Sequence, residues 1–175
     1  MKIAVIGYSG SGKSTLAKKL GNIYNIPVLH LDKIQFEANW KERYIETSKK
    51  MVREFLEENQ SWVIDGNYTN LLRDQRLEEA DLIIYMCFSR WTCFRQAFKR
   101  YLEHKGKTRE CMADGCNEKF DYEFIKWILL DGRSKDKKKQ YADTVSKYNE
   151  KVTILSNSKD TKLFCKELKD NNILP

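Results

Sequence analysis

The sequence predicts an α/β protein with three layers, α/β/α, in which helices cover both faces of a mainly parallel sheet of five strands. Two observations support this prediction. Apolar runs of strand length alternate with segments of helical periodicity, and a glycine-rich segment lies between the first apolar run and the first helix. The length of 175 residues suits one domain with its own core. We therefore expect a single domain over residues 1–175.

Five apolar runs have the length expected of strands. They cover residues 2–6, 28–31, 62–64, 82–88 and 152–155. Five segments with helical periodicity lie between these runs. The first begins at Lys13 and ends before Pro27, because proline cannot continue a helix. The other four cover residues 41–58, 89–103, 121–130 and 134–148.

Residues 104–120 interrupt the helical periodicity and predict neither a helix nor a strand. Loops of this length inside a compact domain usually act as lids or as binding loops. We therefore expect a helical lid, inserted over about residues 100–133.

The composition predicts a soluble protein of the cytoplasm. The mean hydropathy is −0.66, and no apolar stretch approaches the length needed to cross a bilayer, so we expect no membrane partner. The five cysteines are an odd number, which favours a reducing compartment. Cys111 and Cys116 resemble half of a zinc site, but the sequence offers no two further ligands at matching spacing.

The net charge of +7 is concentrated in one third of the chain. Residues 89–139 contain 14 Lys and Arg against 8 Asp and Glu. Such an excess is typical of a solvated basic face or of a nucleic-acid-binding patch. It also suits a surface that faces phosphate groups, and the glycine-rich segment is what favours this last interpretation.

That segment, from Gly7 to Ser14, matches the pattern G-x-x-x-x-G-K-[ST] between a predicted strand and a predicted helix. This is the context of a P-loop, whose inward-facing amide groups bind a polyphosphate beside a helix N-terminus. Lys13 is expected to reach the β- and γ-phosphates, and the hydroxyl of Ser14 to bind Mg²⁺. The residues expected to bind the triphosphate are Gly7, Ser9, Gly10, Ser11, Gly12, Lys13, Ser14 and Thr15. The predicted fold is therefore that of the P-loop NTPases.

Two aspartates follow predicted strands and should reach the sheet edge where ligands bind. Asp65 precedes a glycine and is expected to hold Mg²⁺ with Ser14, although an Asp-Gly turn is the alternative. Asp32 is expected to orient or deprotonate the hydroxyl of an acceptor, with helix capping or a lysine partner as its alternative. We interpret His30 as a packed or hydrogen-bonded residue.

Several arginines flank or lie within the expected lid. Arginine stabilises the charge that develops on a phosphoryl group during its transfer. Taken singly, each arginine is typical of a protein surface, but as a set they are candidates for this role. The four candidates are Arg95, Arg100, Arg109 and Arg133.

These residues resemble the nucleoside monophosphate kinase group, which includes adenylate kinase and shikimate kinase. Three segments with Trp127 are most similar to the adenylate-kinase-related proteins labelled DNA topology modulation proteins: His30-Leu31-Asp32, WVIDGNY at 62–68 and GCNEKFD at 115–121. The resemblance spans nearly the whole chain and implies a five-stranded ATP-binding core, a mobile lid and Mg²⁺-dependent phosphoryl transfer. Adenylate kinase has an AMP-binding arginine after its Asp-Gly pair that this chain lacks, and Arg73 or Arg76 is a candidate replacement.

The sequence thus predicts a kinase that transfers the γ-phosphoryl group of Mg-ATP to a nucleoside, a nucleotide or another hydroxylated metabolite. Two alternatives stay open: a nucleotide-dependent regulatory protein that influences DNA topology, and a simple ATPase. We expect ATP and Mg²⁺ as cofactors and a small-molecule acceptor as partner. Nucleic acid is an alternative partner that the motifs do not favour, and both a monomer and a homodimer are compatible with the sequence.

Overall fold

A parallel sheet of five strands forms the centre of the computed structural model, which describes residues 1–170. The strand order is β2-β5-β1-β6-β7, and every neighbouring pair is parallel. The strands are β1 (Lys2–Gly7), β2 (Val28–His30), β5 (Trp62–Asp65), β6 (Leu82–Met86) and β7 (Val152–Leu155). The predicted α/β fold with a parallel five-stranded sheet is confirmed.

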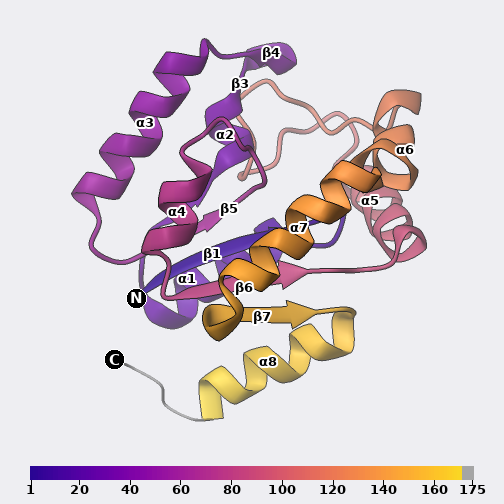
Figure 1. The fold of residues 1–175 in the computed structure, drawn as a ribbon. Coiled ribbons are helices and arrows are strands. Elements are labelled where there is room, and N and C mark those ends of the chain that lie inside the picture. The colour runs from indigo at the N-terminus through magenta and orange to yellow at the C-terminus, as the bar shows by residue number, and fades with distance from the viewer. Residues whose placement is uncertain (171–175) are drawn as a thin grey trace.

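Helices cover both faces of this sheet. In Figure 1, α7 crosses the near face and α1 lies behind it, while α8 runs alongside β7. The α-helices are α1 (Lys13–Tyr24), α2 (Leu31–Gln35), α3 (Ile45–Glu58), α4 (Arg73–Glu79), α5 (Arg90–His104), α6 (Tyr122–Leu129), α7 (Lys135–Lys147) and α8 (Ser158–Asp170). Short 3₁₀ helices are η1 (Ala38–Trp40), η2 (Asp131–Arg133) and η3 (Asn149–Lys151). Among residues 1–170, no helix has both the length and the apolar character needed to cross a bilayer.

The three inner strands are buried almost throughout, because layers on both faces exclude water from them. Their carboxyl ends lie at one edge of the sheet, as parallel pairing requires. The register places His30 opposite Asp65, and Asp65 opposite Val5, two residues before the glycine-rich loop begins. Residues far apart in the sequence therefore meet at this edge.

The chain leaves the sheet earlier than predicted at residue 31. Strand β2 ends at His30, and Leu31 and Asp32 form the first turn of α2, so Asp32 lies on a helix instead of directly at a strand end. The apolar side chain of Leu31 made the predicted strand one residue longer. Leu31 is fully buried, but as the first residue of α2.

The predicted helix over residues 41–58 begins only at Ile45. Residues Lys41–Glu42 form β4, which pairs antiparallel with β3 (Phe36–Glu37). Asn39 and Trp40 between these strands have φ of 61° and 63°, so the chain reverses direction there instead of entering a helix. Helices α2, α4 and α8 were not predicted.

Residues 105–121 form the predicted long loop, which we call the lid loop. Isolated bridges pair Lys105 with Glu118 and Thr108 with Asn117, and these bridges fold the loop back on itself. A small apolar cluster, separate from the main core, attaches the loop to the β3–β4 hairpin. This lid cluster consists of Met112, Ala113 and Cys116, with Phe36, Trp40 and Cys111 packed against them.

Candidate nucleotide and acceptor site

The glycine-rich loop connects β1 to α1 and passes directly under α5. Gly10 has a φ of +79°, and a Cβ at this position would lie 2.5 Å from the backbone oxygen of Cys93 on α5. Only glycine combines this backbone conformation with so close an approach. The contact fixes the loop against the helix that leads to the lid loop.

The start of α1 has the properties of an anion site. Its N-cap is Gly12, and no side chain caps the first turn, so amide groups at this end lack helical partners. The Oγ of Ser11 is buried in the same loop and has no hydrogen-bond partner among the described residues. Unpaired donors beside the positive end of a helix favour a bound phosphate. The loop therefore fits the polyphosphate that its sequence predicted.

Lys13 supplies a positive charge inside this loop. Its Nζ donates a hydrogen bond to the backbone oxygen of Tyr8 at 3.0 Å. Burial lowers the pKa of Lys13, while the negative charges of Asp32 and Asp65 oppose that shift. Burial thus disfavours the charged form of Lys13, and an approaching phosphate would stabilise that form.

Asp65 and Ser14 meet at the carboxyl edge of the sheet. The hydroxyl of Ser14 donates to one carboxylate oxygen of Asp65 at 2.7 Å, and Nδ1 of His30 contacts the other. The structure describes no group of three or more His, Cys, Asp or Glu side chains that would enclose a metal ion within residues 1–170. Mg²⁺ is usually held by one or two protein oxygens, with water and substrate phosphates completing its shell. Ser14 and Asp65 fit this mode of binding.

Asp32 faces the same space from the first turn of α2. One of its carboxylate oxygens accepts a hydrogen bond from the hydroxyl of Tyr68 at 2.7 Å. Burial first, and the charge of Asp32 second, raise the pKa of Tyr68 far above its usual range. Tyr68 therefore remains a hydrogen-bond donor at neutral pH and holds the Asp32 carboxylate in place.

Two of the predicted arginines meet at one buried carboxylate. Arg100 of α5 and Arg109 of the lid loop both form ion pairs with Glu118, through different carboxylate oxygens and each at 2.5 Å. Burial, and then the neighbouring Arg109, lower the pKa of Arg100. Glu118 thus holds together two guanidinium groups that would otherwise repel each other.

The other two predicted arginines do not line the cavity that contains the loop. Arg95 is exposed on α5. Arg133 lies over the ring of Tyr8, with 3.7 Å between its Cζ and the ring centroid, and it donates to the backbone oxygen of Phe88 at 2.8 Å. Arg133 therefore supports the glycine-rich loop from outside the cavity.

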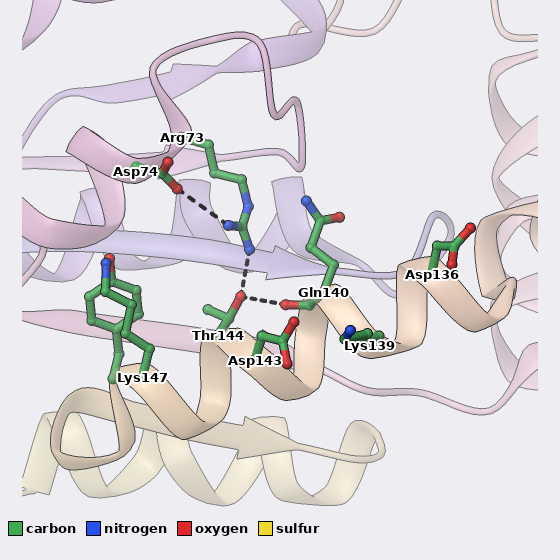
Figure 2. Close-up of a pocket in the computed structure, with 9 residues that line it drawn as sticks. Arg73, Asp74, Asp136, Lys139, Gln140, Asp143, Thr144 and Lys147 are labelled. Carbon is green, nitrogen blue, oxygen red and sulfur yellow. Dashed lines mark hydrogen bonds and ion pairs between the residues drawn. The ribbon is translucent and has the colours of Figure 1, made fainter.

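Arg73 and Arg76 do not replace the AMP-binding arginine of adenylate kinase. Arg76 is 1% exposed, and its guanidinium donates to the backbone oxygens of Leu71 and Tyr68. Arg73 points toward α7, where it donates to the hydroxyl of Thr144 at 2.5 Å (Figure 2). Arg73 lines a separate surface pocket of about 400 Å³ between α4 and α7.

One cavity of about 1370 Å³ brings most of the predicted residues together. The loop residues from Ser9 to Thr15 line it, and so do Asp32, Asp65, Arg100 and Arg109. Gly7 does not line it but begins the loop. The cavity thus contains a phosphate-binding loop, a metal-binding pair, a carboxylate and two arginines.

Two residues that shape this cavity, Asn67 and Trp127, carried part of the family resemblance but were given no role from the sequence. Asn67 accepts from the amide of Gly7 at 3.1 Å and donates to the hydroxyl of Tyr141 at 2.7 Å, which ties β5 to the loop and to α7. Trp127 of α6 donates from its indole to the hydroxyl of Ser9 at 3.0 Å. The sequence did contain a signal for Asn67, because this residue directly follows the Asp-Gly pair at the end of a predicted strand, where ligands bind.

Comparison with known proteins gives a likeness in structure only. No family model matches the sequence, and no curated protein matches it. A crystal structure of shikimate kinase from Bacteroides thetaiotaomicron matches this chain with a TM-score of 0.49 and 17% sequence identity, over 99% of each chain.

Proposed function

We propose that this protein is a kinase that transfers the γ-phosphoryl group of Mg-ATP to a hydroxyl group of a small acceptor. One observation carries the proposal. A single cavity is lined by the P-loop with Lys13, the pair Ser14 and Asp65, the carboxylate of Asp32, and the arginines that Glu118 holds. Each of these parts has a distinct task in phosphoryl transfer.

The roles follow from position. The loop and Lys13 bind the triphosphate, and Ser14 and Asp65 would hold Mg²⁺, which neutralises charge on the phosphates when it is bound. Asp32 accepts the proton of the acceptor hydroxyl. The acceptor oxygen then bonds to the γ-phosphorus, the bond from that phosphorus to the bridging oxygen breaks, and ADP leaves. Arg100 and Arg109 face the transferring group.

The lid loop supports transfer to an acceptor over hydrolysis. Its residues Arg109, Cys111 and Met112 line the cavity together with the P-loop, and the lid cluster attaches it to the hairpin beside Asp32. A covered site excludes water, which would otherwise compete with the acceptor for the phosphoryl group. A simple ATPase has no need of this cover.

A phosphate-transfer screen tests the proposal. Nucleosides, nucleotides and other hydroxylated metabolites are supplied with Mg-ATP, and ADP release is measured. We expect one of them to stimulate ADP release severalfold, and Lys13→Met to abolish turnover while thermal melting shows an intact fold. Equal turnover with and without every acceptor would instead support the ATPase. Salt-dependent binding to duplex DNA beyond that of a generic basic protein would favour the regulatory alternative, for which the resemblance to DNA topology modulation proteins is the present support.

A further inference from the structure

Asp32 and four other residues that line the cavity form what we call its acceptor half: Asp32, Phe36, Trp40, Tyr68 and Met112. From these residues we propose that the phosphoryl acceptor is an uncharged compound that carries both a planar aromatic ring and a hydroxyl group, as nucleosides do, and not a phosphorylated or carboxylated one. The inference rests on the proposed kinase function and narrows its acceptor.

The first argument concerns what Asp32 offers. Tyr68 already donates to one oxygen of this carboxylate, and the raised pKa of Tyr68 keeps it a donor. The second oxygen of Asp32 is bonded to no described residue. A carboxylate accepts hydrogen bonds and donates none, so it selects a ligand group that donates. A hydroxyl group satisfies Asp32, whereas an anionic oxygen would be repelled by it.

The second argument concerns the apolar wall. Phe36 begins β3 directly after α2, and it lines the same cavity as Asp32. Trp40 packs edge-on against Phe36, with 5.3 Å between the ring centroids, and the indole nitrogen of Trp40 is already bonded to the backbone oxygen of Asn117 at 2.9 Å. Met112 of the lid loop packs on the same pair. Aromatic and thioether groups of this kind favour a flat, apolar ligand surface.

The third argument concerns the arginines that an anionic acceptor would need. Three arginines that could serve an anionic acceptor are each bonded elsewhere. Arg76 is buried against backbone oxygens, and Arg73 reaches α7 (Figure 2). Arg43 donates to the backbone oxygens of Ile34 and Phe36. None of the three lines the cavity.

Three of the cations that line the cavity have partners. Lys18 pairs with Glu110, Lys119 lies over the ring of Trp40, and Arg109 pairs with Glu118. Asp32 and Asp65 add two carboxylates to the same wall. A second anion beside the bound triphosphate would therefore meet two negative groups, while these three cations already have other partners.

Calorimetry tests this inference with the full chain, Mg²⁺ and a non-hydrolysable ATP analogue. The ligands are the common nucleosides, their 5′-monophosphates, and shikimate as a hydroxylated acid. We expect at least one nucleoside to bind about tenfold more tightly than its own monophosphate and than shikimate. Tighter binding of a monophosphate or of shikimate, or no binding by any nucleoside, would overturn the inference.

A matched pair of variants links the result to the apolar wall. Phe36→Leu removes the ring but keeps apolar volume in the lid cluster. It should weaken nucleoside binding about tenfold and leave the affinity for the ATP analogue unchanged. Tyr44→Leu is the control, because Tyr44 is 72% exposed and lies outside the cavity. Equal nucleoside affinity in wild type and Phe36→Leu would contradict the assigned wall.

The two proposals fail in different ways. Without binding of the ATP analogue, the kinase function and the acceptor inference both fall. If the analogue binds and a monophosphate or a hydroxylated acid is then phosphorylated, the kinase function stands and the acceptor inference fails.

Discussion

His30 contacts the carboxylate of Asp65 across the carboxyl ends of β2 and β5, where the two residues are direct neighbours in the sheet register. The other oxygen of Asp65 accepts from Ser14. The imidazole therefore fixes the orientation of a carboxylate that we expect to hold Mg²⁺. Groups that orient metal-binding carboxylates usually change metal affinity when they are removed.

Substitution His30→Gln should weaken the apparent affinity for Mg²⁺ by about tenfold or more, while saturating Mg²⁺ should restore turnover. The measurement is ADP release over a range of Mg²⁺ concentrations. His104→Gln is the control, because His104 ends α5 and makes no contact with Asp65. An unchanged Mg²⁺ dependence in His30→Gln would show that the imidazole only packs.

Lys13 should make stability depend on pH in a defined direction. Because burial lowers its pKa below 10.5, the unfolded chain binds more protons at this site between the folded-state pKa and 10.5. The contribution of Lys13 to the free energy of unfolding therefore rises with pH across that window. Urea denaturation of wild type and Lys13→Met, without nucleotide, measures this contribution as the difference between them.

We expect wild type to gain stability relative to Lys13→Met as the pH rises from neutral toward 10.5. Comparison with the variant is needed because burial also raises the pKa of Tyr68 and Tyr85. Above pH 10 these tyrosines lower the free energy of unfolding as the pH rises, and the variant shares this effect. A difference that falls as pH rises would mean that the folded protein favours the charged lysine, which contradicts its burial.

Glu118 is a positioning residue in our scheme, because it acts through Arg100 and Arg109. Glu118→Gln removes the charge that holds both guanidinium groups, so we expect kcat to fall by about 10²-fold with a smaller change in the KM for ATP. Glu118→Asp should recover part of the loss. Steady-state kinetics with the acceptor identified by the screen gives both constants.

The control for Glu118 is Glu54→Gln on α3, which loses only an exposed ion pair with Lys50 at 3.6 Å. It should behave as wild type. If Glu118→Gln lowered thermal stability but left kcat unchanged, the carboxylate would serve the fold alone.

Gly10→Ala should be among the most damaging changes in the loop. The new Cβ would meet the backbone oxygen of Cys93 at 2.5 Å, and alanine disfavours a φ of +79°. We expect a loss of about 1 to 3 kcal/mol in unfolding free energy and a marked loss of ATP affinity. Denaturant melts and calorimetry measure the two effects.

Gly106→Ala separates the two causes. Gly106 also has a positive φ of +73°, but nothing lies within 4 Å of a Cβ built there. Gly106→Ala should therefore lose only the unfolding free energy that the positive φ costs, and its affinity for ATP should be unchanged. Equal effects of the two substitutions would mean that the contact with α5 contributes nothing.

The sequence allowed prediction of those parts of the fold and site that depend on local patterns. The strands appear as apolar runs, and the P-loop appears as spaced glycines before Lys13, because short-range backbone geometry requires them. Helix α8 also had a local signal that was overlooked: the Asn157 side chain accepts from the amides of Lys159 and Asp160 at its start, and apolar residues recur through Phe164 and Leu168.

Other parts depend on contacts between distant residues and leave no local pattern. Glu118 gains its role only when α5 and the lid loop bring Arg100 and Arg109 to it. Arg95 sits on the same helix as Arg100, but the five-residue spacing leaves it facing solvent. His30 was predicted to be packed or hydrogen-bonded, and it is hydrogen-bonded, but its partner Asp65 lies 35 positions away in the chain and leaves no local pattern.

The lid cluster has a thermodynamic consequence for the two substrates. Cys116 donates to the backbone oxygen of Glu37 at 3.1 Å, and the amide of Asn39 donates to Gly115, so the hairpin beside Asp32 and the lid loop with Arg109 are joined. A ligand that orders one of them therefore orders the other. Binding of ATP should therefore raise the affinity for the acceptor, and binding of the acceptor should raise the affinity for ATP by the same factor. The two ligands would thus bind with positive cooperativity.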